Sequence, residues 1–352
     1  MVDQLLKEKS VWENLMEVKK PLVLYGMGDG ADRVLKELSL LHVKISAVMA
    51  SDSFVRGQSF HGFTVKTLSQ IEQEFPDFII LLAFGSGRTE VIDDIRRLAG
   101  KHKILVPSVP VAGECIFNRS YLLKNGTEID QAYSLMADEQ SKKVFECMCR
   151  FEFTGELHCL FEMESSKDEA FKILALTSKE NYLDLGAYRG DTIDEFLKYT
   201  CGQYNSITAL EPDIKTYRKL CEAKGDLPNT NLINKGIWSH NTHVCMKSNK
   251  GKGSVIDSKG DNVAAVTNID SLAKETAFTY IKIDVEGVEF IAISGGSMLL
   301  KEKKPKLNVA CYHRCADIYR LPAMIKKINP DYKIYMRHHP YIPCWDTNLY
   351  CV

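Results

Sequence analysis

An acidic residue and two glycines follow a hydrophobic run just past the middle of the chain, in NYLDLGAYRGDT. Glycine has no Cβ and adopts positive φ, so a loop of this kind lets backbone N–H groups face a polar ligand at a helix start. The D-x-G-x-x-x-G spacing is wider than the loop that approaches a pyrophosphate. It favours a bulkier, less anionic group, such as the methionine part of S-adenosylmethionine, although a generic strand-to-helix turn would also show it. The expected contact residues are Asp184, Gly186, Ala187, Tyr188, Gly190, Asp191 and Thr192.

A second acidic residue ends the next apolar run, SITALEP. Glu211 follows Gly186 by about 25 residues, a position from which a carboxylate can accept both ribose hydroxyls of an adenosine. We therefore expect Glu211 and Pro212 to contact a cofactor, rather than Glu211 being a surface residue at a strand end. Asn234 and Gly236 of NKGIW are expected to border the adenine.

Charged residues alternate along the apolar segment TYIKIDVEG, where Lys282, Asp284 and Glu286 share one face of the predicted strand. Such charges are costly unless they are paired or lie at a strand tip. Asp284 and Glu286 are candidate catalytic residues, either as a general base for a hydroxyl or as ligands of a divalent cation. Alternatively, Lys282 pairs with Asp284, and Glu286 or Glu289 caps the following helix, which is the reading we favour for Glu289.

Histidines follow two later strands. His313 ends ACYH and is a third candidate catalytic residue, because an imidazole near its usual pKa can accept a proton at neutral pH; a hydrogen-bonded structural histidine is the alternative. His338 and His339 in YMRHHP are expected at a polar strand end rather than in a cleft wall.

The segments LDLGAYRGDT, ALEPD, NKGIW, TNIDSL and YIKIDVEGVEFIAISGG resemble the FkbM family of S-adenosylmethionine-dependent methyltransferases. The resemblance covers roughly residues 178–352. It implies O-methylation of a sugar or another small hydroxylated metabolite, on the way to a polysaccharide or a secondary product, with Asp284 also near the cofactor. The family often has Glu two residues before the histidine, and this chain has Cys311 there. That departure puts a Glu–His pair at this place in doubt.

The N-terminal part has its own glycine-rich turn, LYGMGDGADRVL. Gly26, Gly28 and Gly30, with Asp52 after the next strand, are candidate ligand contacts, although Asp29 would repel a pyrophosphate. Residues 20–110 resemble the Rossmann-like domain at the start of some bacterial sugar-modifying enzymes. That resemblance implies nucleotide-sugar or substrate binding. A structural or dimerising role stays open, as does an NAD-dependent oxidoreductase, for which His61 and His102 are the proton-transfer candidates.

Alternating strand and helix patterns predict an α/β protein with parallel sheets. We expect a Rossmann-like accessory domain over residues 1–112, with a helix over residues 3–18. We expect this domain to be followed by a helical connector over 113–176 and then by a methyltransferase domain over 177–352. The latter should have about seven strands, including one over 231–238 and a terminal antiparallel hairpin, and a helix from Glu289 to Lys301. The polar stretch 247–261 is either a mobile lid or an exposed loop.

Composition narrows the function classes. With 45% hydrophobic and 26% charged residues and a net charge of −1, the chain fits a soluble globular protein, and nothing calls for nucleic acid or an anionic membrane. No apolar run approaches the ~20 residues of a membrane span. The 11 cysteines lack metal-site spacing and are expected to be reduced in the cytoplasm. We expect a small-molecule acceptor and allow a homodimer; the alternative to an enzyme is a binding module that senses the cofactor.

Overall fold

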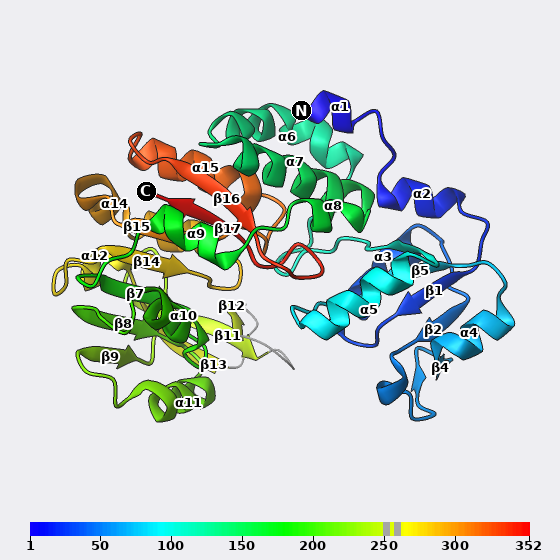
Figure 1. The fold of residues 1–352 in the computed structure, drawn as a ribbon, viewed down its shortest axis with the longest axis horizontal. Helices are drawn as coiled ribbons and strands as arrows, with labels where there is room; N and C mark the ends of the chain where they lie inside the picture. Colours follow the sequence, from blue (N-terminus) through cyan, green and yellow to red (C-terminus); the bar gives the residue numbers. More distant parts are fainter. Residues whose placement is uncertain (249–253, 257–261) are drawn as a thin grey trace.

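The computed structural model describes residues 1–248, 254–256 and 262–352, which form two α/β lobes joined by a group of helices (Figure 1). The N-terminal lobe has one six-stranded sheet in the order β3-β4-β2-β1-β5-β6. Its strands are β1 (Leu22–Tyr25), β2 (Ala47–Met49), β3 (Ser59–Phe60), β4 (Phe63–Lys66), β5 (Ile79–Leu82) and β6 (Lys103–Leu105). Its helices are α3 (Asp29–Leu40), η1 (Asp52–Phe54), α4 (Leu68–Glu74) and α5 (Thr89–Ala99).

This sheet is parallel except for β3, which pairs antiparallel with β4 and was not predicted. All residues of β1 and β5 are buried, as expected for strands with both faces covered by helices. The two strands are neighbours at the point where the strand order reverses, so the loops after them face a common crevice.

The expected helix over residues 3–18 is instead two short helices, α1 (Val2–Leu5) and α2 (Val11–Glu17). Ser10 caps α2 in a reciprocal capping box with Glu13. The Arg119 guanidinium, from the connector, donates to the carbonyl oxygens of Leu6 at 2.6 Å and Glu8 at 2.7 Å. Because the segment between the helices bonds to this distant arginine, local periodicity could not reveal the break.

The connector is helical, with α6 (Arg119–Ser134), α7 (Glu139–Thr154), α8 (His158–Glu162) and α9 (Lys167–Leu174). Side chains of Asn118, Asp138 and Ser166 cap α6, α7 and α9. One apolar cluster runs through it, from Val23 of β1 through Phe145 of α7 to Ile334 in the C-terminal lobe. The lobes therefore share a continuous core and are not merely tethered.

The C-terminal lobe has a seven-stranded sheet in the order β16-β17-β15-β14-β7-β8-β9, parallel except for β17 and the terminal hairpin that it forms with β16. This architecture confirms the predicted α/β fold and hairpin. Its strands are β7 (Asn181–Leu185), β8 (Ser206–Leu210), β9 (Thr230–Ile233), β14 (Tyr280–Ile283), β15 (Lys306–Ala310), β16 (Ile334–His338) and β17 (Thr347–Cys351). The helices are α10 (Asp191–Tyr199), α11 (Ile214–Lys224), α12 (Ile269–Leu272), α13 (Glu289–Ser294), α14 (Ser297–Lys303) and α15 (Asp317–Ile328).

Two local expectations in this lobe were wrong. The predicted strand over 231–238 is split between β9 and β10 (Gly236–Ile237), because the Asn234 amide donates to the carbonyls of Glu211 and Pro212 and turns the chain out of the sheet. The predicted helix from Glu289 is interrupted at Gly295 and Gly296. There Asp270 accepts hydrogen bonds from the first turn of α14.

A second, four-stranded sheet was not predicted. It has the order β10-β13-β11-β12, with β11 (Thr242–Ser248), β12 (Ser254–Ile256) and β13 (Asn262–Thr267). Most of the stretch 247–261, expected to be a lid or an exposed loop, lies outside the described residues. Among the described residues, no helix is long and apolar enough to cross a membrane.

Candidate functional site

A cavity of about 910 Å³ lies between the two lobes. One wall comes from the loops that follow β7, β8, β14 and β15 of the seven-stranded sheet, where the strand order reverses between β7 and β14. The opposite wall comes from the start of α3 and residues 109–111 in the N-terminal part. The cavity therefore occupies the place where open α/β sheets bind ligands, and both lobes contribute to it.

The glycine loop after β7 is tightly folded. Gly186 and Gly190 have φ of 84° and 91°, and Tyr188 is also left-handed at 48°. A Cβ at Gly186 would collide with the backbone oxygen of Asp284 at the end of β14. The loop thus needs glycine at this position both for its backbone conformation and for its close approach to the neighbouring strand.

Asp184 lies under this loop and is fully buried. Its Oδ2 accepts a hydrogen bond of 2.5 Å from Thr192 Oγ1, and its Oδ1 lies 3.6 Å from Lys282 Nζ with no hydrogen-bond partner among the described residues. Lys282 also donates to the carbonyl oxygen of Gly186 at 3.1 Å. Burial raises the pKa of Asp184, with Lys282 opposing it. The pKa of Lys282 is raised because neighbouring carboxylates, above all Asp184, outweigh burial.

Glu211 lies at the end of β8 beside the glycine loop. Its two carboxylate oxygens accept backbone hydrogen bonds from Tyr188 at 3.0 Å and Asp213 at 2.9 Å, so its side chain is held toward the loop. Burial raises the pKa of Glu211 to about 7, against the opposing effect of these hydrogen bonds. Asn234 braces the same turn through the two carbonyls that it bonds.

The predicted cofactor residues fall into two groups. Those that line the cavity are Gly186, Tyr188, Asp191, Thr192, Glu211, Pro212, Gly236 and Asp284. Those that shape the loops behind it are Asp184, Ala187, Gly190 and Asn234. A buried orphan acceptor on Asp184, a loop without Cβ at Gly186 and a carboxylate at Glu211 fit the methionine and adenosine parts of S-adenosylmethionine.

The three catalytic candidates meet on the same wall. His313 Nε2 lies 3.5 Å from Asp284 Oδ1 and 3.7 Å from Glu286 Oε2. Asp284 Oδ2 lies 3.8 Å from Lys282 Nζ. Glu286 has φ of 55°, a strained conformation of the kind that gathers at functional sites. The two carboxylates are each about one third exposed, while His313 is buried. The carboxylates are thus the groups that a ligand can reach.

Contrary to expectation, Glu289 does not cap α13, because no side-chain hydrogen bond from the described residues caps this helix; Glu289 instead holds the turn after β14 and pairs with His313. Its Oε1 accepts from the backbone N–H of Val285 at 2.9 Å and of Gly287 at 3.3 Å. The same oxygen lies 2.9 Å from His313 Nδ1, an ion-pair distance at which the N–H is not aligned for a hydrogen bond. A carboxylate therefore does accompany His313, although position 311 is a cysteine whose thiol donates to the Thr347 carbonyl at 3.3 Å.

This acidic surrounding changes the expected behaviour of His313. Burial would lower its pKa, but Glu289, Asp284 and Glu286 outweigh burial and raise the pKa to about 9. His313 is therefore a cation at neutral pH, so it cannot accept a proton as the base that its position in the sequence suggested. Glu286 differs from His313 in the cause of its shift, because burial is the main effect that raises the pKa of this carboxyl above its usual value.

The divalent-cation reading fits this cluster poorly. Asp284, Glu289 and His313 have donor atoms within 4.8 Å of one another, a spacing that a metal ion could use. A metal ion would have to displace the proton of His313, because Glu289, Asp284 and Glu286 raise the pKa of this imidazole to about 9. The cluster is better described as an imidazolium surrounded by carboxylates.

Some contributors to the site were not predicted. The Tyr312 hydroxyl lies 3.4 Å from Asp284 Oδ1, and Lys167 lies 3.4 Å from Glu195 and 3.2 Å from Asp346. Tyr341 and Trp345 line the cavity as well. The aromatic residues of RHHPYIPCWD were the available signal. His338 and His339 of that segment are instead in the core, where burial lowers their pKa values to about 3 and about 4.

Only some of the candidate ligand residues of the N-terminal lobe line the cavity. Gly28 and Gly30 line the cavity, while Gly26 packs against the backbone of Ala83. Asp52 lies exposed in η1, a position that does not suit a ribose contact inside the cavity. His61 pairs with Asp32 at 2.7 Å and His102 with Glu72 at 2.9 Å.

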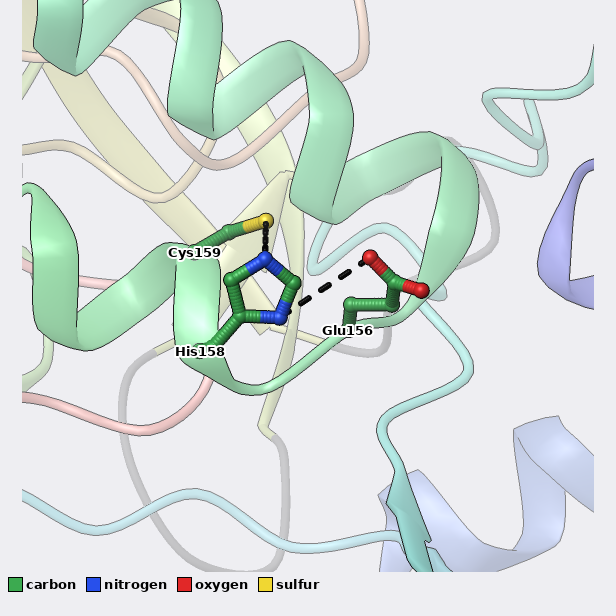
Figure 2. Close-up of side chains that lie close together, drawn as sticks. All are labelled: Glu156, His158 and Cys159. Atoms are coloured by element: carbon green, nitrogen blue, oxygen red, sulfur yellow. Dashed lines mark hydrogen bonds and ion pairs between the residues drawn. The ribbon is translucent and has the colours of Figure 1, made fainter. Parts of the chain in front are cut away.

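Another group of potential ligand atoms lies on the connector, where the His158 ring stands between Glu156 and Cys159 (Figure 2). The distances are 3.8 Å from Nδ1 to the Glu156 carboxylate and 3.7 Å from Nε2 to the Cys159 sulfur. Burial raises the pKa of the Cys159 thiol to about 12. A thiol of that kind is a poor metal ligand at neutral pH.

Comparisons with known proteins agree with this geometry. Residues 184–328 match the family described as the methyltransferase FkbM domain. The crystal structure of methyltransferase FkbM from Methylobacillus flagellatus KT superimposes with a TM-score of 0.69 at 19% identity, covering 100% of this chain and 93% of that one. Fibrillarin from Aeropyrum pernix, in complex with natively bound S-adenosyl-L-methionine, is a more distant match. Its TM-score is 0.34 at 13% identity, and the match covers 53% of this chain and 74% of that one. No curated protein matches the sequence. The C-terminal half is an FkbM-family, S-adenosylmethionine-dependent methyltransferase domain.

Proposed function

We propose that this methyltransferase transfers a methyl group to a hydroxyl of a sugar or another small hydroxylated metabolite. The observation that carries the proposal is the meeting of Asp284 and Glu286 at the His313 imidazolium, on the wall of the cavity that also carries the cofactor residues. A hydroxyl is a poor nucleophile until a base takes its proton, so a carboxylate cluster suits an oxygen acceptor.

The cofactor supplies an activated methyl group when it is bound. Glu211 and the glycine loop, which Asp184 supports from behind, would hold it, and Asp284 and Glu286 would lie on the acceptor side. Much of the rate enhancement then comes from placing the acceptor oxygen in line with the methyl group.

Glu286 is the better candidate for the base, since its raised pKa brings it closer to neutral pH than an ordinary carboxyl group. Asp284 lies between Lys282 and His313, two cations that pair with its carboxylate. Its carboxylate can instead accept a hydrogen bond from the hydroxyl and orient it. His313 keeps the two carboxylates together at one place by its positive charge.

The direct test is methyl transfer from labelled cofactor to a panel of sugars, with the product position identified by NMR. Methyl groups found only on nitrogen or carbon would refute the proposal. Glu286→Gln should lower kcat by about 10²- to 10⁴-fold while leaving the affinity for S-adenosylhomocysteine unchanged. Glu302→Gln, an exposed carboxylate on α14, is the matched control and should keep full activity.

Activity should also depend on pH in two directions. The rate should rise as Glu286 loses its proton above the usual carboxyl range, and fall as His313 loses its proton near pH 9. At saturating cofactor, which removes the effect of Glu211 on binding, the rising limb should disappear in Glu286→Gln and the falling limb remain. A rising limb unchanged in this variant would assign the base to another residue.

A further inference from the structure

We propose that Tyr341 and Trp345 form an aromatic platform for the acceptor, that the N-terminal lobe holds this platform in place, and that it selects an uncharged pyranose ring. This inference rests on the proposed O-methylation and names the class of acceptor for that site. It also gives the N-terminal lobe a role that its glycine turn alone did not reveal.

The platform lies beside the reacting groups. Tyr341 and Trp345 both line the cavity, together with Asp284, Glu286 and Tyr312. Their ring centroids are 5.8 Å apart, with planes inclined by 37°, and both side chains are only half-buried. Accessible aromatic surface next to groups that accept hydrogen bonds is the typical lining of a pocket for a small polar ligand with one apolar face.

The N-terminal lobe fixes this segment through the loop after β5. Ser86 and Ile342 exchange two backbone hydrogen bonds, of 2.7 Å and 3.0 Å. A Cβ at Gly85 would collide with the Trp345 ring, and a Cβ at Gly87 would lie 2.7 Å from the Tyr341 ring. The two glycines therefore allow both rings to rest directly on the backbone of this loop.

The charges around the cavity argue against an anionic acceptor. Arg33 pairs with Asp29 at 2.7 Å and donates to the carbonyl oxygens of Pro110 and Val111. Lys167 is shared by Glu195 and Asp346, and Lys282 by Asp184 and Asp284. These three cations are already matched by acceptors of the protein, as is the His313 imidazolium, which leaves Lys235 as a single further cation in the described lining.

The carboxylates are the more numerous lining charges. Those along the cavity wall are Asp29, Asp32, Asp191, Glu195, Glu211, Asp284, Glu286 and Asp346. A diphosphate or sugar phosphate would meet this negative field without a free cluster of cations, which costs binding energy. Sugar hydroxyls, in contrast, can donate hydrogen bonds to carboxylates, and the C–H face of a pyranose can pack on an aromatic ring.

The experiment is saturation-transfer NMR on the full chain saturated with S-adenosylhomocysteine, with methyl β-D-glucopyranoside and methyl β-D-galactopyranoside as neutral probes and glucose 1-phosphate as the anionic one. We expect saturation of at least one glycoside and at least tenfold weaker binding of glucose 1-phosphate. Trp345→Ala should weaken glycoside binding at least tenfold, and Trp345→Phe should retain most of it.

Gly85→Val tests the role of the N-terminal lobe, because it displaces Trp345 without changing any residue of the cavity wall. It should weaken glycoside binding like Trp345→Ala, while calorimetry should show an unchanged affinity for S-adenosylhomocysteine in every variant. Thermal melts followed by circular dichroism identify a variant that fails to fold. In that case, the smaller losses of glycoside binding in Trp345→Phe and Tyr341→Phe test the role of the two rings.

The outcomes separate the two proposals. Failure of both glycosides to bind, equal binding of glucose 1-phosphate, or full binding in Trp345→Ala would overturn the platform. Failure of the wild type to bind S-adenosylhomocysteine would instead count against the cofactor site, whatever the glycosides do. Methyl transfer to nitrogen or carbon would refute O-methylation even if a glycoside binds.

Discussion

The molecule contains two glycine loops that look alike in sequence but differ in surroundings. Each follows the first strand of its sheet and opens a helix, and each lies where the strand order reverses. The C-terminal loop, Gly186–Gly190, has a buried carboxylate beneath it and Glu211 beside it. The N-terminal loop, Gly26–Gly30, has Asp52 on the exposed surface instead.

The crevice between β1 and β5 also differs from its counterpart. The loop after β5 contacts Tyr341 and Trp345 of the C-terminal lobe, and Arg33 at the start of α3 bonds to the segment at residues 110 and 111. The loop after β5 thus packs against protein, while the loop after β1, like the strand ends of the C-terminal lobe, opens to the cavity. An NAD-dependent oxidoreductase would need this crevice for a dinucleotide, whereas a structural role of the N-terminal lobe explains its contacts with the C-terminal lobe.

The comparison shows that a glycine-rich turn leaves space at a strand end but does not determine whether a ligand or another part of the protein occupies that space. Gly186 is required by positive φ and by the nearby backbone of Asp284. Gly28 has φ of −108°, and among the described residues nothing lies within 4 Å of a Cβ built there. Glycine is therefore essential at position 186 and replaceable at position 28, although Gly26, with φ of 129°, and Gly30, where a Cβ would lie 2.7 Å from the Ala83 oxygen, are constrained as well.

The largest expected difference comes from adding one methyl group to each loop. Gly186→Ala should lower the free energy of unfolding by about 3 kcal/mol, since it forces a side chain into a left-handed conformation and against the end of β14. Gly28→Ala should change it by less than about 0.5 kcal/mol. Chemical denaturation of both variants measures the contrast, and similar losses would show that the N-terminal turn is equally constrained.

A smaller difference is expected for the acidic residue that follows each loop. Glu211→Ala should weaken S-adenosylhomocysteine binding by about 1–3 kcal/mol through the loss of its charged hydrogen bonds to the ribose. Asp52→Ala should leave this affinity unchanged, because Asp52 lies exposed in η1. Calorimetric titration checks both, and the comparison fails if Asp52→Ala weakens binding as Glu211→Ala does.

The smallest effect is the pH dependence of that affinity. Because the pKa of Glu211 is raised to about 7, its carboxylate form is mostly absent at pH 6 and mostly present at pH 8. Binding of S-adenosylhomocysteine should accordingly be about tenfold weaker at pH 6, since one pH unit below the pKa leaves about a tenth of the groups ionised. Glu211→Gln should bind with little dependence on pH. An unchanged slope in this variant would point to another titrating group.

The sequence alone was sufficient wherever the signal was local. Buried runs such as LVLY and YIKI and the glycine spacing after β7 predict the elements and the cofactor loop, because these signals depend on neighbours in the chain. The place of Glu211 at the end of β8 also follows from strand alternation, since parallel strands bring their carboxyl ends to one edge.

Only the tertiary structure decided what these groups do together. His313 is a cation because Asp284, Glu286 and Glu289 converge on it, and electrostatic energy depends on distance in space rather than along the chain. Likewise, Gly85 and Trp345 are 260 positions apart in the sequence but lie in contact. The sequence thus determined the buried parallel strands, the terminal hairpin and the cofactor loop. The charge of the catalytic histidine and the joining of the two lobes around one cavity were set by packing between distant segments.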